Sequence, residues 1–400
     1  MASPAFAIRG VNAYRRNMNS VERHKNRYIR RKAARDAKRA KKICIYDDFE
    51  QVFTWDNLFE SYRRSCLGVG WKCSTQLYKT NATINVTDTY LKLMNNKYKS
   101  GGFYEFTIME RGKLRHIKSV HISERVVQKC LCDYSLTPML SRTFIYDNGA
   151  CMKNKGIDFA INRLKRHLCS FYRHNGIDGY VLTFDFSKYF DTINHEILKQ
   201  KIAEKYADQR ILRLIYDFID NFGGGAGLGL GSQISQTCAL FYPSEIDHAI
   251  KEKMHIKYYG RYMDDGYLIH HSKEHLKECL KLIKKLCDSL GIKLNKNKTQ
   301  ITKLSRSFTF LKKRIRLTET GKIVMKISKK SIKAMRHKLH CFKSRLENHE
   351  MSMDRIKQSF TSWIGHALGF DTYKTVQSLT NYFNKLFGNS NQSYIAKMAN

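Results

Sequence analysis

The sequence has few acidic residues for its length and no long apolar segment. Its 400 residues include 35 aspartates and glutamates against 72 lysines and arginines, so the formal net charge is +37. Such an excess attracts polyanions, and phosphate contacts dominate the affinity of proteins for nucleic acids. No apolar run reaches the length of a bilayer span. We therefore predict a nucleic-acid partner and no membrane, with an acidic membrane surface as the weaker alternative.

The sequence also lacks the cysteine spacing of a zinc site. Its 11 cysteines are scattered, Cys130 and Cys132 stand too close together for a zinc ribbon, and no second pair follows them. An odd number of scattered cysteines is typical of free thiols in a reducing compartment. No secretory signal is recognisable. We therefore expect a cytoplasmic protein, and its length allows several subdomains around their own cores.

The chemistry of the chain centres on two adjacent aspartates, Asp264 and Asp265. Strand-forming residues 255–262 precede them, and Gly266 with a second apolar run follows. This order predicts a β-hairpin with both acids at its tip. Two carboxylates so close repel each other and lose hydration on burial, so they need a neutralising cation. For such a pair taken alone, a solvated turn is the alternative.

A third acid, Asp185, ends the apolar stretch Val181–Asp185, and a turn and a helix over residues 194–205 are predicted after it. A strand at this position can lie beside the hairpin and bring Asp185 to Asp264. Three carboxylates on neighbouring strands are what two-metal phosphoryl transfer needs. Because oxygen ligands suit hard divalent ions, we expect two Mg²⁺ ions, with Mn²⁺ as a substitute.

The motif Tyr262-Met263-Asp264-Asp265 resembles the polymerase-centre motif of reverse transcriptases, and the likeness continues in order over residues 50–385. The resemblance implies an α+β right-hand polymerase fold. Its expected parts are a basic arm (1–52), fingers (53–180), a palm with an antiparallel sheet (181–315) and a helical basic thumb (316–400). It also implies that Asp185, Asp264 and Asp265 are catalytic and bind metal, and that the Phe186 carbonyl is a further ligand.

The fingers contain two motifs that the resemblance assigns to the incoming nucleotide. Residues 103–117 predict a hairpin with basic residues on its return strand, so Arg115 and Lys113 would contact the triphosphate. A basic strand facing solvent is the alternative. In the second motif, many family members have arginine where this chain has Met152. Either Lys153 or Lys155 can supply that charge.

Phe190 stands where reverse transcriptases place an aromatic ring beneath the sugar. By resemblance, this ring would collide with a ribose 2′-hydroxyl and so select deoxynucleotides. Spacing alone favours a core phenylalanine at a helix start.

A glycine-rich stretch over residues 223–231 precedes a predicted helix and lacks the Gly-Lys-Ser/Thr of a Walker loop. It resembles the reverse-transcriptase loop that packs against the template and the nascent base pair. The resemblance makes Leu230, Gly231 and Ser235 template and fidelity residues, and Gln236 a nucleotide contact. An aliphatic residue at Leu230 and the pair Ser235-Gln236 are similar to the reverse transcriptases of diversity-generating retroelements, which usually have isoleucine there and a proline upstream, at the position of Gly229. In that subgroup the aliphatic residue relaxes fidelity opposite template adenines.

Downstream motifs continue the likeness. Lys298 would protonate or steady the departing pyrophosphate, as a general acid, with a plain surface lysine as the alternative. Phe310 and Leu311 correspond to the primer grip, where the family usually has glycine in place of Lys312. Residues 360–366 again resemble the diversity-generating subgroup. Residues 331–347 predict a basic thumb helix.

Residues 8–42 are rich in lysine, arginine and alanine, with no apolar face to pack. We predict an arm that is mobile alone and becomes helical on RNA or DNA. A solvated tail without a dedicated partner is the alternative.

Three interpretations of the biological role remain open. The first is the error-prone enzyme of a diversity-generating retroelement, prokaryotic or phage-encoded, with a structured template RNA, cDNA and deoxynucleotides as partners. The interpretation leaves room for a small basic accessory protein and for a homo-oligomer. The second is an antiphage-defence reverse transcriptase that copies a dedicated noncoding RNA. The third is an inactive RNA-binding scaffold.

Overall fold

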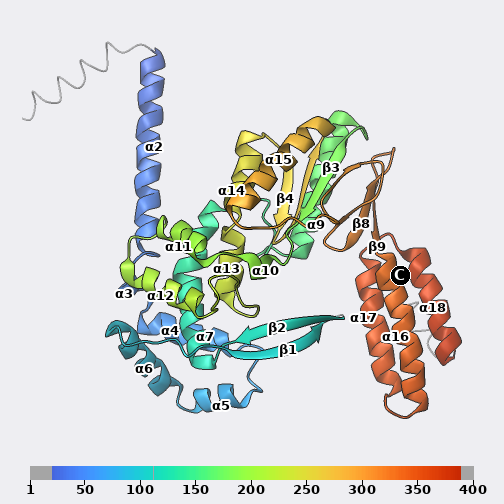
Figure 1. The fold of residues 1–400 in the computed structure, drawn as a ribbon, viewed down its shortest axis with the longest axis horizontal. Coiled ribbons are helices and arrows are strands. Elements are labelled where there is room, and N and C mark those ends of the chain that lie inside the picture. Colours follow the sequence, from blue (N-terminus) through green and yellow to red (C-terminus); the bar gives the residue numbers. More distant parts are fainter. Residues whose placement is uncertain (1–19, 111, 389–400) are drawn as a thin grey trace, which may run out of the picture. The chain divides into compact units, whose positions relative to one another are not determined.

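The computed structural model describes residues 20–110 and 112–388, and its fold is drawn in Figure 1. The chain forms two compact units. Unit 1 comprises Met1–Arg142, His195–Gly225 and Gly229–Thr237, and unit 2 comprises Thr143–Asn194, Ala226–Leu228 and Cys238–Asn400. Helices and antiparallel sheets occur together, so the fold class is α+β, as predicted. Among the helices of the described residues, none is long and apolar enough to cross a membrane.

Unit 1 is mainly helical. Its helices are α2 (Ser20–Cys44), α3 (Phe49–Val52), α4 (Trp55–Ser65), α5 (Cys73–Thr80), α6 (Ala82–Met94), α7 (Ile122–Leu131), α8 (Thr137–Leu140), α11 (His195–Ala203), α12 (Gln209–Asp220) and the start of α13 (Gln233–Phe241). Helix α4 begins at Thr54, whose hydroxyl accepts a hydrogen bond from the Asn57 amide at 3.1 Å. Its buried face carries Leu58 and Tyr62. Helix α4 is therefore amphipathic, with Thr54 as its N-terminal cap.

The basic arm contains one long helix, α2. We expected the arm to gain its helix on RNA or DNA, and this expectation is wrong for residues 20–44, which are helical in the chain alone. Alanine, lysine and arginine have high helix propensity, and 25 residues exceed the length at which an isolated helix is marginal. Residues 8–19 lie outside the described part of the chain.

A two-stranded hairpin of β1 (Tyr104–Glu110) and β2 (Lys113–Ser119) also belongs to unit 1. The strands are antiparallel, with Ile108 opposite Arg115. Gly112 lies in the turn with φ +75°, which glycine adopts without steric cost. The predicted hairpin is confirmed.

Unit 2 is built on a four-stranded antiparallel sheet in the order β4-β5-β3-β6. The strands are β3 (Tyr180–Asp185), β4 (Tyr258–Tyr262), β5 (Asp265–His270) and β6 (Gln300–Lys303). Helix α9 (Ile157–Asn175) packs on the face that carries Val181, Tyr267 and Ile269. Leu182 and Leu268 alternate with these residues and so point to the other face. Helix α15 (Lys273–Ser289) also contacts β3 and β5.

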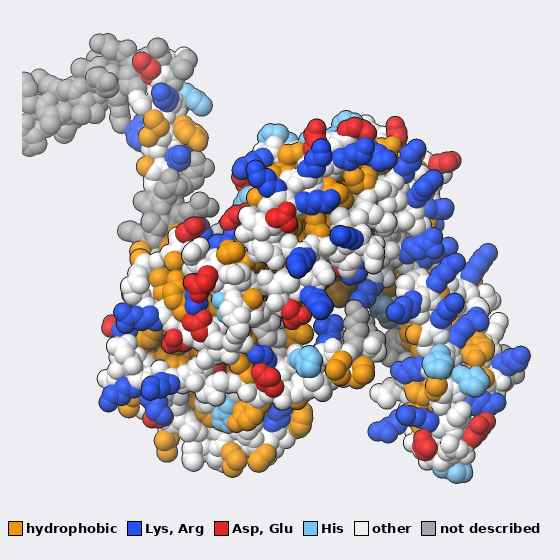
Figure 2. Space-filling view, in the orientation of Figure 1, with side chains coloured by type: hydrophobic (Ala, Val, Ile, Leu, Met, Phe, Trp, Pro, Cys, Tyr) orange, Lys and Arg blue, Asp and Glu red, His pale blue; other side chains and the backbone are white. Residues whose placement is uncertain are grey.

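The remaining elements of unit 2 complete the chain. They are α10 (Tyr189–Thr192), α14 (Ser244–His248), the three-stranded antiparallel sheet β7 (Phe308–Phe310), β8 (Lys313–Leu317) and β9 (Ile323–Ile327), and the helices α16 (Lys329–Glu347), α17 (Met353–Leu368) and α18 (Tyr373–Phe387). Leu339, Phe360 and Leu379 lie in a common core of these last three helices. Figure 2 shows lysine and arginine side chains on their surface. The predicted thumb helix over residues 331–347 lies within α16.

Replacing Gly266 with alanine is expected to destabilise unit 2. Gly266 pairs with Phe184 across β5 and β3, and an added Cβ would overlap the Phe184 ring. Overpacking of this kind costs about 1–3 kcal/mol, so the urea midpoint of unfolding should fall. The matched control is Gly365→Ala in α17, where nothing lies within 4 Å of the added carbon. That variant should be neutral or gain up to about 1 kcal/mol; equal midpoints for the two variants would contradict the packing argument.

Candidate active site

Three aspartates meet at one end of the four-stranded sheet. Asp185 ends β3, Asp265 begins β5, and the two are direct partners in the antiparallel register. Asp264 lies in the turn between β4 and β5, and its carbonyl oxygen accepts a hydrogen bond from the Phe186 amide at 3.2 Å. The structure therefore confirms that the Asp185 strand lies beside the hairpin that carries the other two acids.

The three carboxylates disfavour one another's ionised forms. Burial raises the pKa of Asp265, and the neighbouring Asp185, within hydrogen-bonding reach, and Asp264 raise it further. Burial also raises the pKa of Asp264, and the charge of Asp185 adds to this effect. Lys298 acts in the opposite direction on both groups. A cation is thus needed for all three carboxylates to be charged together.

Asp185 is held by two residues of the segment that precedes β6. The Lys298 ammonium lies 2.6 Å from Asp185 Oδ1 and the Asn295 side-chain amide donates to Oδ2 at 3.2 Å. The Asn295 backbone amide also donates to the Asp185 carbonyl at 2.8 Å. Desolvation alone would lower the pKa of Lys298, but its hydrogen bond to Asp185 outweighs this and raises it. Lys298 is 59% exposed and Asp185 5%, so this cation reaches the acid from the solvent side.

The donor set suits a hard divalent ion, since it consists of three carboxylates whose mutual repulsion a dication relieves. Across residues 20–110 and 112–388, no group of three or more His, Cys, Asp or Glu side chains is arranged to hold a metal ion as it stands. Both oxygens of Asp185 already accept hydrogen bonds, from Lys298 and Asn295. A metal ion at Asp185 would therefore compete with the Lys298 ammonium for the charge of this carboxylate.

Phe190 lies next to the turn that carries the aspartates. Its half-buried ring packs against Ala150, Leu240 and Met263. The Phe190 carbonyl accepts a hydrogen bond from the Leu228 amide at 2.8 Å. Both the core and the sugar-contact interpretations fit this position, because one face of the ring is packed and the side chain remains partly exposed.

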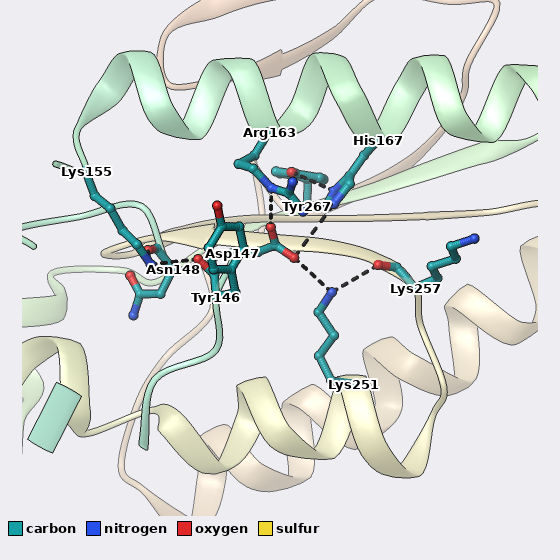
Figure 3. A network of polar contacts seen from close by, with 9 residues as sticks. All are labelled: Tyr146, Asp147, Asn148, Lys155, Arg163, His167, Lys251, Lys257 and Tyr267. Atoms are coloured by element: carbon teal, nitrogen blue, oxygen red, sulfur yellow. Dashed lines mark hydrogen bonds and ion pairs between the residues drawn. The ribbon is translucent and has the colours of Figure 1, made fainter. Parts of the chain in front are cut away.

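The second fingers motif is a loop fixed by a polar network, drawn in Figure 3. Asp147 accepts hydrogen bonds from Arg163 Nε at 2.6 Å and Lys251 Nζ at 3.1 Å. Although burial alone would raise the pKa of Asp147, these cations lower it. Burial lowers the pKa of His167 to about 4, so its ring is neutral and joins Arg163 to the Tyr267 hydroxyl.

The two lysines considered as replacements for the family arginine differ in their surroundings. Lys155 donates to the carbonyl oxygens of Tyr146 at 2.7 Å and Asn148 at 3.0 Å, so its ammonium stabilises the loop itself (Figure 3). Lys153 is exposed. Of the two, Lys153 remains available for a phosphate.

The glycine-rich loop belongs to unit 1 from Gly229 on, and this part is joined to the fingers hairpin. The Leu230 carbonyl accepts a hydrogen bond from the Lys118 amide of β2 at 3.2 Å, and Leu230 forms a parallel bridge with Ile117. At Gly229 an added Cβ would lie 2.7 Å from the Phe222 ring, so the proline usual in the diversity-generating subgroup does not fit here. Gly231 has φ +112°, which favours glycine.

A buried amide also supports this loop. Gln128 of α7 accepts a hydrogen bond from Ser232 Oγ at 3.0 Å and donates to Glu124 at 3.1 Å. Ser235 is buried, whereas Gln236 is exposed on α13 and thus accessible to a ligand. Arg115 and Lys113 both lie in β2, in the same unit.

The predicted primer grip is the β7–β8 turn. Phe310 is buried against Tyr267, with ring centroids 5.0 Å apart, and Leu311 is half-buried. Leu311 and Lys312 have φ values of +49° and +62°. The turn thus keeps a left-handed conformation even though lysine replaces the usual glycine, at a cost of roughly 1–2 kcal/mol per residue.

Sequence reasoning missed four residues that support the site: Asn295, Arg261, Asp247 and Asp147. Their partners are distant along the chain, so no local spacing marks them. The one available signal was Arg261, a charged residue within an apolar strand pattern.

Residues 98–315 match the family described as reverse transcriptase (RNA-dependent DNA polymerase). The chain belongs to the reverse transcriptase family. Residues 98–315 are therefore an RNA-directed DNA polymerase domain, a nucleotidyltransferase, and this family generally uses divalent metal ions. The match includes the three aspartates and Lys298.

Solved telomerase structures are similar to this reverse transcriptase. Apo telomerase from Candida tropicalis, truncated from its C-terminal domain, is 16% identical, with 55% of this chain and 54% of that chain covered and a TM-score of 0.43. Telomerase from Candida albicans, in complex with a fragment of telomeric RNA, is 13% identical, with 74% and 61% covered and a TM-score of 0.46. The chain thus spans between about half and three fifths of these proteins. No curated protein sequence matches it.

Mg²⁺ is expected to stabilise the reverse transcriptase against heat, and more strongly at pH 8 than at pH 6. Because the folded-state pKa values of Asp264 and Asp265 are raised, stability without metal falls as pH rises above the ordinary carboxyl range. Mg²⁺ relieves that repulsion, whereas protons compete with it at low pH. At a hundredfold excess over its Kd the ion should contribute about 2.7 kcal/mol.

Thermal unfolding with and without Mg²⁺ checks this expectation. Asp265→Asn serves as the comparison, since it removes one charge at nearly constant volume. An equal Mg²⁺-dependent shift in this variant would place the stabilising ion elsewhere.

Proposed function

We propose that the whole chain is an active reverse transcriptase that copies an RNA template into cDNA. The observation that supports this proposal is the β3–β5 register, which pairs Asp185 with Asp265 and sets Asp264 in the adjoining turn. Asp185, Asp264 and Asp265, with the Phe186 carbonyl, would hold two Mg²⁺ ions, for which Mn²⁺ can substitute. When bound, these ions activate the 3′-oxygen of the primer and neutralise the triphosphate.

In this mechanism Lys298, whose ammonium lies 2.6 Å from Asp185 Oδ1, would be the proton donor. Its raised pKa keeps it protonated, and its exposure leaves it free to leave Asp185 and protonate the departing pyrophosphate. Arg115, Lys113 and Lys153 would bind the triphosphate, with Gln236 as a further nucleotide contact. Phe190 would lie beneath the sugar and exclude a 2′-hydroxyl.

The remaining assignments follow the right-hand arrangement. Fingers over 53–180, palm over 181–315 and thumb over 316–400 would grip the template and primer, with Phe310 and Leu311 at the primer end. The basic arm, 1–52, would bind the enzyme's own RNA. Template RNA, cDNA and deoxynucleotides are the partners of this cytoplasmic enzyme.

We further propose that the enzyme serves a prokaryotic or phage-encoded diversity-generating retroelement, with a small basic accessory protein or a second copy of the chain as a partner. Leu230-Gly231, Ser235-Gln236 and residues 360–366 support this role. An antiphage-defence enzyme that copies one noncoding RNA is the second candidate, because such enzymes share the same catalytic motifs.

Purification from cells that carry the native locus tests these proposals. Sequencing the bound RNA, and the cDNA made with Mg²⁺ and four deoxynucleotides, should give cDNA from one structured RNA with changes at template adenines. Asp264→Ala should abolish cDNA synthesis, because it removes a ligand of the catalytic ions, while RNA binding persists. Faithful or repetitive cDNA would favour the defence role, and no cDNA from any template would favour an inactive scaffold.

Leu230→Gln is expected to lower misincorporation opposite template adenines, because a polar side chain at this position would tighten the grip on template geometry. The backbone bond from Lys118 to Leu230 does not depend on the side chain, so the rate of correct incorporation should change little. Sequencing cDNA from a defined template measures both effects. The control is Leu230→Met, which keeps an apolar side chain at the same position. Leu228→Gln would be unsuitable as a control because Leu228 is buried. An unchanged error spectrum in Leu230→Gln contradicts the hypothesis.

A further inference from the structure

Arg261, the residue before the Tyr262-Met263-Asp264-Asp265 motif, is fully buried. Its guanidinium forms a two-pronged ion pair with Asp247, with Nε 2.8 Å from Oδ1 and Nη2 2.6 Å from Oδ2. Both side chains are 0% exposed. The Tyr259 hydroxyl also donates to Asp247, at 2.5 Å. The acid is therefore satisfied, and it orients the guanidinium rather than leaving it free to rotate.

The other donors of the guanidinium reach two backbone carbonyls. Nη1 donates to the Met263 oxygen at 2.9 Å and Nη2 donates to the Leu240 oxygen at 3.0 Å. Met263 has φ +52°, a left-handed conformation that is disfavoured for a residue with a side chain. Its carbonyl belongs to the peptide group that leads into Asp264. The hydrogen bond from Arg261 Nη1 to this oxygen therefore fixes the plane of the Met263–Asp264 peptide, to which the Asp264 side chain is attached.

The backbone of Arg261 is also tied on its other side. Its amide donates to the Asp147 carbonyl at 3.2 Å, and its carbonyl accepts from the Gly149 amide at 2.9 Å. Asp147 is itself fixed through Arg163 and Lys251 (Figure 3). Arg261 thus joins a rigid loop, the buried Asp247 and the turn that carries two aspartates.

Stability alone does not account for this arrangement. A buried ion pair loses hydration on both partners, and apolar residues of similar volume are often as stabilising or more so. What apolar residues cannot supply is a planar fork that meets a carboxylate and a carbonyl at once. Lysine also cannot supply it, because its single ammonium is a point charge without a fixed fork.

We propose that Arg261 is a positioning residue for nucleotidyl transfer. Held by Asp247, its guanidinium fixes the Met263–Asp264 peptide and so sets the orientation in which Asp264 and Asp265 meet the divalent ions. The inference rests on the proposed polymerase activity. In this role the Arg261–Asp247 pair does not bind the metal itself but holds the turn whose aspartates bind it. Loss of such support typically costs 10–100-fold in metal affinity or activity.

Arg261→Lys is the central test, because it keeps the charge beside Asp247 and loses the fork. The assay is deoxynucleotide addition to a DNA primer on a defined RNA template by the full chain. We expect kcat to fall about 10–100-fold and the Mg²⁺ concentration for half-maximal rate to rise about tenfold. The KM for the nucleotide should stay near its original value. Mn²⁺, which binds such ligands more tightly than the harder Mg²⁺, should restore part of the rate.

Arg210→Lys is the matched control. It makes the same change in unit 1, where the Arg210 guanidinium also reaches a carboxylate, Glu50 at 3.5 Å, and backbone carbonyls, those of Leu93 at 3.4 Å and Met94 at 3.3 Å, rather than the Met263–Asp265 turn. It should leave the Mg²⁺ requirement unchanged, whatever its effect on thermal stability. Asp247→Asn keeps the volume of the acid and removes its charge, so it should raise the Mg²⁺ requirement in the same direction as Arg261→Lys.

The outcomes separate the inference from the proposed function. If the wild-type chain has no polymerase activity, the proposed function itself is wrong. If the wild type is active and Asp264→Ala is not, a folded Arg261→Lys with unchanged kcat and Mg²⁺ requirement overturns only the positioning role. The positioning role is also overturned if the activity of Arg261→Lys falls only in proportion to its folded fraction while its Mg²⁺ requirement is unchanged. If Arg261→Lys does not fold at the assay temperature, the Mg²⁺ requirement of Asp247→Asn decides.

Discussion

Repulsion among three carboxylates is the constraint on which the rest of unit 2 depends. The β3–β5 register sets Asp185 opposite Asp265, and both Asp264 and Asp265 have raised pKa values from burial and from their neighbours. An isolated strand pair would relieve such repulsion by shifting or fraying. Here the apolar faces of the sheet prevent it, because a one-residue slip would move Val181 and Ile269 out of the α9 core.

Hydrogen bonds reinforce this cluster at two points. Lys298 and Asn295 hold Asp185, whereas Arg261 holds the Met263 carbonyl in the turn. The two supports differ in exposure, and this difference separates their roles. The Lys298 side chain is 59% exposed, which leaves it accessible to a phosphate as our proposal requires, whereas the Arg261 side chain is 0% exposed. The site thus combines a solvent-exposed cation with a buried one.

Much of this arrangement was readable from the sequence because it is local. The hairpin around Asp264, the strand that ends on Asp185 and the fingers hairpin all follow from residue patterns within one strand pair or one strand. Arg261 and Asp247 are different, since their pairing arises when α14 packs near β4 and no spacing encodes that packing. Residues 20–44 of the arm are helical without an apolar face because their length and their content of alanine, lysine and arginine favour helix.

The part of the glycine-rich loop from Gly229 on is held to the fingers hairpin by its backbone. Leu230 is attached to β2 by the hydrogen bond from the Lys118 amide, and Ser232 is held by the buried Gln128. Arg115 lies on the same strand as Lys118. Because the bond from Lys118 involves only backbone atoms, it does not depend on which side chain stands at position 230. Under our proposal, an exchange of that side chain would therefore change the grip on the template and leave the strand predicted to bind the triphosphate in place.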